Sequence, residues 1–421
     1  MDIGLLERHI CGAHVFSQAR CVPFPAPSGR PRKDCVGIGP TASSGLASIR
    51  HESANHPVDC EDAGLRWSCE EKMAVVDPSY GFLACRYLRE QLDVLMDELR
   101  GVRANEGIEP VHQARVASRR IRAALRMFGD CFEPGRLAKW QRQVKKLTRE
   151  LGAARDRDVQ IEFVAQTLAR LDKKDGKHRP GIQRLLLRLR QGRAAMQPEV
   201  IALLDKLDDT NVLAQMCGHL EETLFKLKSH DVNVCSPYVC EMAAQHIRAR
   251  RQDWIACERS LDDPQDAAGH HRLRIAAKKL RYTLEICDPV YEGQMAGVIK
   301  AARRVQSLLG DIHDCDVWAQ DIDAFLEQER RAAAEYYGHS RPFHRLRPGL
   351  HFIRKERLAH RRAAFAELIE YWKQMDAQNL WESLEDALRR HVEAVGPSAP
   401  KRQDERTDGT EGQIEKDRAA Q

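Results

Sequence analysis

Two separated stretches of the chain carry side chains whose types and spacing could bind an anion. Residues 111–128 read VHQARVASRRIRAALRMF, and residues 271–284 read HRLRIAAKKLRYTL. Neither 112–126 nor 271–281 contains an acidic residue. Like charges three or four residues apart cost a helix about 0.2–0.5 kcal/mol per pair. These charges therefore call for a partner, either acidic residues from other helices or a bound polyanion.

The bases of each stretch share one face when they are placed on a helix. At about 100° per residue, the first set falls within an arc of about 80° and comprises His112, Arg115, Arg119, Arg122 and Arg126. The second set comprises His271, Arg274, Lys278 and Arg281. Apolar residues such as Ile121 and Leu280 lie on the opposite sides. The pattern predicts two amphipathic helices, each with a basic stripe and a buried stripe.

The two stretches belong to an internal repeat. His112 and His271 are 159 residues apart, and the same offset takes Pro78 to Pro237. Downstream, LGAARDRDV at 151–159 matches LGDIHDCDV at 309–317 with an offset of 158. Sparse charges that stay in register over such a distance indicate a duplication. Each motif follows a further basic helix, and the two helices carry Arg142, Lys145, Lys146 and Arg149, and Lys300, Arg303 and Arg304.

The composition favours an all-helical fold. Of the 421 residues, 43% are hydrophobic, 31% charged and 6% aromatic, and few segments alternate with period 2. No apolar run approaches the 18 or so residues of a membrane span, so no membrane association is expected. The first residues lack the apolar core of a signal peptide. A cytoplasmic location with reduced cysteines is therefore the default expectation.

Helical segments follow one another from Pro78. We expect helices over 78–102, 111–128, 134–151, 156–172, 182–206, 210–230, 237–261, 270–287, 292–309 and 314–337, and a helical region over 350–392. Residues 1–72 lack periodicity and predict a low-order N-terminal extension. Met73 is then an alternative functional start. Residues 393–421 predict a disordered tail.

The carboxylates behind the repeated LG pair raise the question of catalysis. His313-Asp314 resembles the central pair of a metal-dependent phosphohydrolase, with His271 upstream, yet the first copy has Arg155 where a histidine ligand would be needed. The cationic surroundings also disfavour a divalent ion. We expect instead that a helix ends at Leu151-Gly152 and that aspartates cap the next helix or orient arginines. No Walker-type, HExxH or GxSxG motif occurs, nor does CxxC spacing for zinc in 1–72. We expect no catalytic residue, metal or cofactor.

The residue types of the stripes distinguish between polyanions. Proteins that read nucleic acid place Asn, Gln or aromatic residues among the bases, for hydrogen bonds or stacking. Here only Trp140 and Tyr282 lie near the stripes. Arginine, lysine and histidine alone bind phosphate without reading bases. An inorganic phosphate chain or a phosphorylated metabolite is favoured, and RNA or DNA binding is the alternative.

At these residues the sequence resembles the CHAD domain, the conserved histidine α-helical domain. VHQARVASRRIRAAL pairs with HRLRIAAKKLRYTLE, and each is followed by a basic helix and LGxxxDxDV. The resemblance covers about residues 77–392, with repeat one at about 77–235 and repeat two at about 236–392. CHAD domains are often fused to a triphosphate-tunnel enzyme with an ExExK motif. That motif is absent here, so no such activity is expected.

The resemblance implies internally duplicated helical bundles with pseudo-two-fold symmetry around a basic central channel. It implies non-catalytic binding of inorganic polyphosphate, localisation to polyphosphate granules, and enzymes of phosphate metabolism as partners. The motif is matched residue by residue by His112, Arg115, Arg119 and Arg122, and by His271, Arg274, Lys278 and Arg281. The bases of the second basic helices match by register. The alternatives are an RNA-binding protein and a metal-dependent phosphohydrolase.

Overall fold

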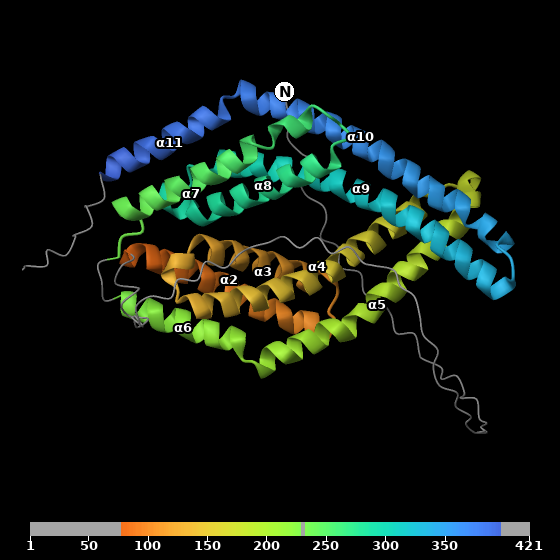
Figure 1. Ribbon diagram of the computed structural model, residues 1–421, viewed down its shortest axis with the longest axis horizontal. Helices are drawn as coiled ribbons and strands as arrows, with labels where there is room; N and C mark the ends of the chain where they lie inside the picture. The colour runs from red at the N-terminus through yellow and green to blue at the C-terminus, as the bar shows by residue number, and fades with distance from the viewer. Residues whose placement is uncertain (1–76, 229–231, 397–421) are drawn as a thin grey trace, which may run out of the picture. The chain divides into compact units, whose positions relative to one another are not determined.

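The computed structural model describes residues 77–228 and 232–396, which belong to one unit of the chain (Figure 1). The extension expected over 1–72 and nearly all of the tail expected over 393–421 lie outside these residues. The described part forms ten α-helices joined by short loops and 3-10 turns, with no β-strand. This confirms the all-helical fold class. Within it, no helix combines the length and apolar character needed to cross a bilayer.

Five helices precede the break at 229–231. They are α2 (Pro78–Ala104), α3 (Ile108–Met127), α4 (Pro134–Arg170), α5 (Arg179–Asp209) and α6 (Val212–Leu227). The carboxylate of Asp77 accepts hydrogen bonds from the first turn of α2, and Pro78 suits the first helical position. Helix α3 packs between α2 and α4, while α6 covers α2. The α3 side chains therefore have a fixed scaffold.

Five further helices follow in the same order of packing. They are α7 (Pro237–Ile255), α8 (Ala267–Cys287), α9 (Ala296–Tyr337), α10 (Arg347–Ala377) and α11 (Leu380–Val395). Ser236 caps α7 and Asp266 caps α8. Helix α8 packs between α7 and α9, and α11 covers α7. Asn379, with a left-handed φ of 49°, separates α10 from α11, so the region expected over 350–392 is two helices.

The expected helix ends behind the LG pairs are wrong. Helix α4 continues through Gly152 to Arg170, and α9 continues through Gly310 to Tyr337. Asp156 and the other motif aspartates therefore lie inside helices and cap nothing. A glycine costs about 1 kcal/mol in a helix interior, and here the packing of long helices outweighs that local preference.

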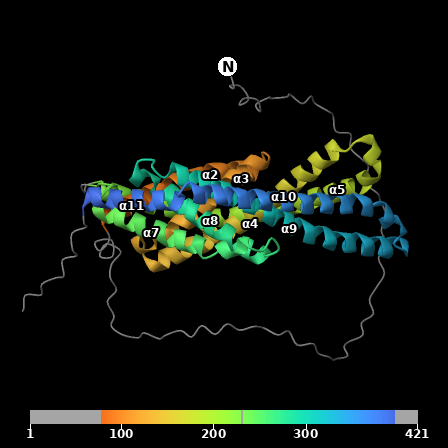
Figure 2. The same cartoon turned by 90° about the horizontal axis from the view of Figure 1, so that it is seen from above.

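Buried side chains form two hydrophobic clusters. The larger one joins the helices around α3 and α8 and includes Leu88, Ile121, Leu280 and Leu309. The expected buried faces of α3 and α8 lie in it. The smaller one includes Ile182. It lies where the C-terminal halves of α4 and α9 meet the N-terminal halves of α5 and α10 (Figure 2). Each buried Leu or Ile contributes about 1.5–3 kcal/mol, so the apolar stripes fix both sets of helices.

Helices α5 and α10 touch backbone to backbone near their first turns. Gly181 lies against the backbone of Leu346 and Gly349, and Gly349 lies against the backbone of His178. A Cβ atom on either glycine would collide with a carbonyl oxygen of the other segment. Both glycines belong to an Arg-Pro-Gly sequence, at 179–181 and 347–349. Only glycine permits this approach.

The glycine contact predicts a loss of stability in Gly181→Ala. The added methyl group forces the two backbones apart, so we expect the free energy of unfolding to fall by about 1–3 kcal/mol. Denaturant titration measures it. Gly218→Ala in α6 is the matched control, since nothing lies within 4 Å of its added Cβ, and it should be neutral or stabilising by up to about 1 kcal/mol. Equal effects in the two variants would contradict the backbone contact.

Candidate polyanion-binding site

The basic stripes of α3 and α8 come together because these two helices pack against each other (Figure 1). The Arg119 guanidinium of α3 lies 6.0 Å from the ring centre of Tyr282 on α8. Burial lowers the pKa of Arg119, and the neighbouring Arg115, Arg274 and Arg281 lower it further, whereas Tyr282 raises it. Residues 159 positions apart in sequence thus form one cationic cluster.

Lys278 has the most perturbed charge in the cluster. Burial, and after it the charges of four arginines, together lower its pKa from 10.5 to about 7; the arginines are Arg119, Arg274, Arg115 and Arg122. Three of these come from α3. Both causes act against the charged ammonium. A negatively charged ligand at this place would relieve the repulsion and hold the proton on Lys278.

The glycines of the two LG pairs lie beside equivalent arginines. A Cβ on Gly152 of α4 would lie 3.5 Å from the Arg115 Nε atom, and one on Gly310 of α9 would lie 4.0 Å from the Arg274 Nε atom. The guanidinium groups of α3 and α8 therefore lie close to the backbone of the next helix. The two glycines therefore hold equivalent places within α4 and α9, each beside the first arginine of a stripe.

The motif aspartates differ in their surroundings. The second of each motif forms an ion pair with an arginine of the following helix: Asp158 with Arg193 at 2.8 Å, and Asp316 with Arg361 at 2.5 Å. These pairs join α4 to α5 and α9 to α10. The first aspartate faces the stripes, since Asp156 lies 3.6 Å from Arg115. The sequence analysis expected the aspartates either to cap the next helix or to orient arginines. In the structure they pair with arginines.

The histidine that opens each stripe has a further base beside it. Burial lowers the pKa of His112, and Arg155 of α4 and Arg115 lower it further, while Glu109 raises it. The ring centre of His271 lies 4.7 Å from that of His313 on α9. Partial burial lowers the pKa of His271 too, and Arg274 and Lys278 add to the effect. Both imidazoles are thereby biased toward the neutral form.

Besides Arg115, four of the expected site residues have acidic partners. The half-buried Glu285 carboxylate, 12% exposed, lies 2.8 Å from Arg281, 3.0 Å from Arg303 and 3.5 Å from Arg120. Arg304 pairs with Glu367 of α10, and Arg149 with Glu150. Sequence reasoning missed Glu285 because the acid-free window ended at residue 281, one helical turn short of it.

Other expected site residues stay apart from the cluster. Arg142, Lys145 and Lys300 are exposed on α4 and α9, and Lys146 is half-buried on α4. Within the described residues no ion pair or hydrogen bond of their side chains joins them to α3 or α8. They add positive charge to the flanks without completing the central cluster.

A pocket of about 310 Å³ lies among α3, α7 and α8. Its lining includes the expected Arg119, Arg122, Arg126 and Lys278 and the neighbouring Tyr282, and also residues that sequence reasoning missed: His246, Arg250 and Lys279. His246 and Arg250 lie one turn apart on α7, a spacing visible in the sequence. No pattern in the sequence, however, predicts that the face of α7 with these two residues lies beside the stripes.

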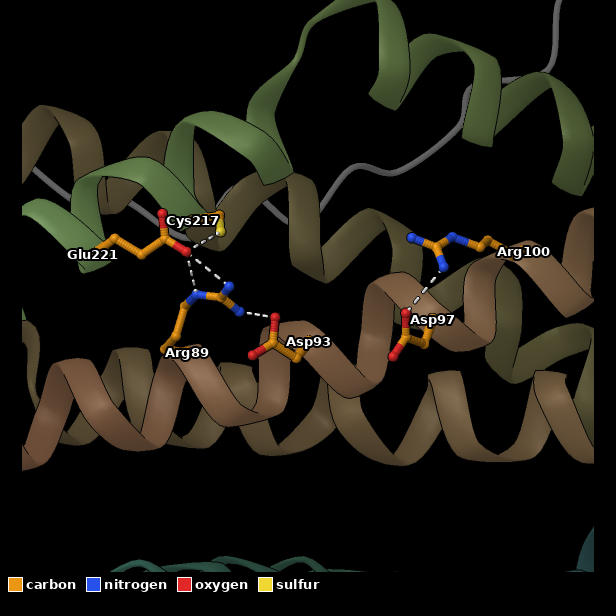
Figure 3. Close-up of polar contacts among 6 residues, drawn as sticks. All are labelled: Arg89, Asp93, Asp97, Arg100, Cys217 and Glu221. Carbon is orange, nitrogen blue, oxygen red and sulfur yellow. Dashed lines mark hydrogen bonds and ion pairs between the residues drawn. The ribbon is translucent and has the colours of Figure 1, made fainter.

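Arginines on α2 show the contrast with an ordinary charged surface (Figure 3). Arg89 donates to Glu221 of α6 at 2.8 Å and pairs with Asp93, while Arg100 pairs with Asp97 at 3.3 Å. Glu221 also accepts a hydrogen bond from the Cys217 thiol. Both arginines thus have an acid one turn away or on the next helix, whereas among the described residues Arg119, Arg122 and Arg126 of α3 form no ion pair.

No group of three or more His, Cys, Asp and Glu side chains is placed to hold a metal ion among the residues that the structure describes. His271, His313, Asp314 and Asp316 are included in that search. His313 has Arg274 close enough to lower its pKa, after the larger effect of burial. The groups that suggested a phosphohydrolase centre are thus side chains within a cationic region.

Comparison with known proteins gives consistent matches. The family model of the CHAD domain matches residues 86–322. Uncharacterized proteins from two strains of Mycobacterium tuberculosis are 28% identical over 246 residues, which is 54% of this chain and 42% of theirs. The chain thus matches less than half the length of these curated relatives. The crystal structure of the CHAD domain from the plant Ricinus communis has a similar fold, with a TM-score of 0.50 at 23% identity over 76% of this chain and 93% of that one.

The position of Lys278 predicts a pH-dependent gain of stability in Lys278→Met. Below pH 7 the ammonium is charged in both states, so its full cost falls on the folded protein. Between pH 7 and 10.5 the folded protein loses the proton while the unfolded chain keeps it, so the cost declines.

Denaturant titrations should therefore show a higher free energy of unfolding for Lys278→Met at pH 6, and a smaller gain at pH 9.5. Lys300→Met, at an exposed position of α9, is the control for the loss of one charge. A Lys278→Met protein no more stable than wild type at pH 6 would contradict the repulsion described for the cluster.

Proposed function

The chain belongs to the CHAD domain family, and we propose that it binds inorganic polyphosphate, without cleaving it, in a basic channel between α3 and α8. The observation that carries the proposal is the meeting of two acid-free stripes in one cluster centred on Arg119 and Lys278. A phosphate chain presents a negative charge at every unit and no bases. It would offset repulsion that the described acids leave in place.

The aromatic residues near the stripes favour a phosphate chain over a nucleic acid. Proteins that bind single strands expose aromatic rings for base stacking. Tyr282 is only 5% exposed, under Arg119 and Arg281, and Trp140 is 2% exposed in the core. Guanidinium and ammonium groups remain accessible for phosphoryl oxygens. The site offers phosphate contacts and little for bases.

We also propose that the halves arose by duplication and are related by a pseudo-two-fold axis along the channel. Helices α2–α6 and α7–α11 repeat one order of packing. Equivalent details support this: Gly181 and Gly349 meet reciprocally, and Gly152 and Gly310 lie beside equivalent arginines. Asp158 and Asp316, at equivalent positions, both pair with an arginine of the next helix.

Within the channel each type of base has its own role in the proposal. Arg115, Arg119 and Arg274 hold phosphoryl oxygens through paired N–H groups. Lys278 takes up a proton as the chain enters. The exposed bases of α4 and α9 guide the chain to the channel by long-range attraction. In a cell, this activity would place the protein in the cytoplasm, at polyphosphate granules, near enzymes of phosphate metabolism.

The proposal predicts selective binding without turnover. Long-chain polyphosphate should bind more tightly than single-stranded RNA of matched charge at physiological salt, and affinity should fall steeply as salt rises. Phosphate release measured in the same samples, with and without Mg²⁺ or Mn²⁺, should stay at background. Equal RNA affinity would instead indicate a generic cationic surface, and release of phosphate would identify a hydrolase.

A second prediction separates the channel from the rest of the basic surface. Each charged hydrogen bond contributes about 1.5–3 kcal/mol, so Arg115→Ala with Arg274→Ala should weaken polyphosphate binding by about a hundredfold or more. Lys173→Ala with Lys174→Ala removes two exposed charges elsewhere and should change affinity by no more than about twofold. Similar losses in the two double variants would argue against a dedicated channel.

The histidines predict a coupling between binding and protonation. The pKa values of His112 and His271 are lowered in the free protein, by burial and then by neighbouring bases. Bound phosphate favours the imidazolium form, so both pKa values should rise when polyphosphate is added, and affinity should increase as pH falls through them. NMR titration of the two rings with and without ligand measures the shift. Unchanged values would remove the histidines from the site.

A further inference from the structure

Resting on the proposed function, we propose that the pocket among α3, α7 and α8 is a discrete site for a compact group of two or three linked phosphates. Such a group is either the end of a polyphosphate chain or a free short oligophosphate. This site differs from the channel as a whole because it depends on α7, which lies outside both stripes. His246, Arg250 and Lys279 become binding residues in addition to the stripe residues that line the pocket.

The pocket is closed at its inner end. The His246 Nε2 atom lies 3.0 Å from the Tyr80 hydroxyl. Tyr80 is 3% exposed, and its ring packs edge-on against Phe128, with the ring centres 5.0 Å apart. The floor beneath His246 is therefore hydrophobic core, which a phosphate chain cannot enter. A phosphate chain that enters the pocket must therefore end in it.

The equivalent position on the other side of the α3–α8 pair contains a carboxylate, which the pocket lacks. With the offset of 159 between the halves, Arg126 in the pocket corresponds to Glu285, and Arg122 corresponds to Arg281. Similarly Lys279 corresponds to Arg120. On the opposite side, Glu285 contacts both Arg120 and Arg281 within 3.5 Å. That half supplies its own carboxylate to neutralise these arginines.

On the pocket side the same position holds another cation, Arg126, and the neighbouring helix adds more. His246 and Arg250 of α7 correspond to Tyr87 and Gln91 of α2, neither of which carries a positive charge. No acidic residue is among the described residues that line the pocket.

Acidic residues near the pocket offset positive charge only at its edge, around Arg250 and His246. Arg250 pairs with Asp253 at 2.6 Å, and Asp130 is near enough to raise the pKa of His246 against the larger lowering by burial. Neither aspartate lines the pocket. The interior, around Arg126 and Lys278, is left with space and without an anion. An external anion would take the place that the Glu285 carboxylate takes on the opposite side.

Size and charge define the ligand. Six arginines and lysines line the pocket, more than one phosphate group of at most two charges would balance. A volume of about 310 Å³ is near the lower limit of about 300 Å³ for ligand pockets. A few linked phosphates match both limits. The end of a chain fits better than its interior, because only a terminal phosphate has a second acidic oxygen and because the floor is closed.

Calorimetric titration of the full chain with tripolyphosphate tests the site. We expect one tripolyphosphate per chain and a loss of affinity of tenfold or more in Arg126→Glu, which places in the pocket the acid that the other half has at Glu285. Arg100→Glu makes the same charge change on exposed α2 surface and should shift affinity by no more than about twofold. Arg250→Gln, which copies Gln91, should weaken binding severalfold without adding a charge, so a folding defect in Arg126→Glu alone would not decide the test.

A second titration distinguishes a chain end from a free oligophosphate. It uses long polyphosphate whose terminal phosphates are capped as phosphoramidates. If capping weakens binding about tenfold in wild type but not in Arg250→Gln, the pocket holds chain ends; if capping changes nothing while tripolyphosphate still binds, it holds free oligophosphate. The proposal is overturned if tripolyphosphate fails to bind, or binds the Arg126→Glu and Arg250→Gln proteins as wild type. Long-chain binding that still depends on Arg115 and Arg274 would then leave the channel proposal intact.

Discussion

Arginine and lysine side chains of α3 and α8 repel one another across the contact between these helices. The hydrophobic core and the ion pairs between helices hold the two helices together against this repulsion. The apolar faces behind the stripes, with Ile121 and Leu280, are buried in the main core. Helices α4 and α9 lie behind, and Asp158 and Asp316 join them to α5 and α10. Burial of apolar surface offsets the repulsion, which leaves a cluster ready to receive an anion.

The two halves deal with this repulsion differently. In the second, Glu285 gathers arginines from three helices and neutralises them internally. In the first, the equivalent Arg126 adds a positive charge beside a pocket. The two halves share one order of helix packing and the ion pairs of Asp158 and Asp316, but the second has the carboxylate of Glu285 where the first has Arg126.

Periodicity was enough to predict the helical class and the buried and basic faces of α3 and α8, because a 3.6-residue repeat is a local property of the sequence. Glycine at 152 and 310 suggested helix ends, but α4 and α9 continue through both positions because the packing of long helices outweighs the local preference of glycine. The contact of Arg119 with the α8 bases, and the place of His246 on the pocket wall, depend on tertiary packing. No spacing rule within one helix could supply them.

In the function proposed for this protein, a phosphate chain neutralises the cluster between α3 and α8. A crystal structure of the protein with long-chain polyphosphate tests it most directly. We expect phosphate density between these helices, with phosphoryl oxygens within hydrogen-bond distance of Arg119 and Lys278. Density confined to the exposed bases of α4 and α9, with the α3–α8 cluster empty, would contradict it.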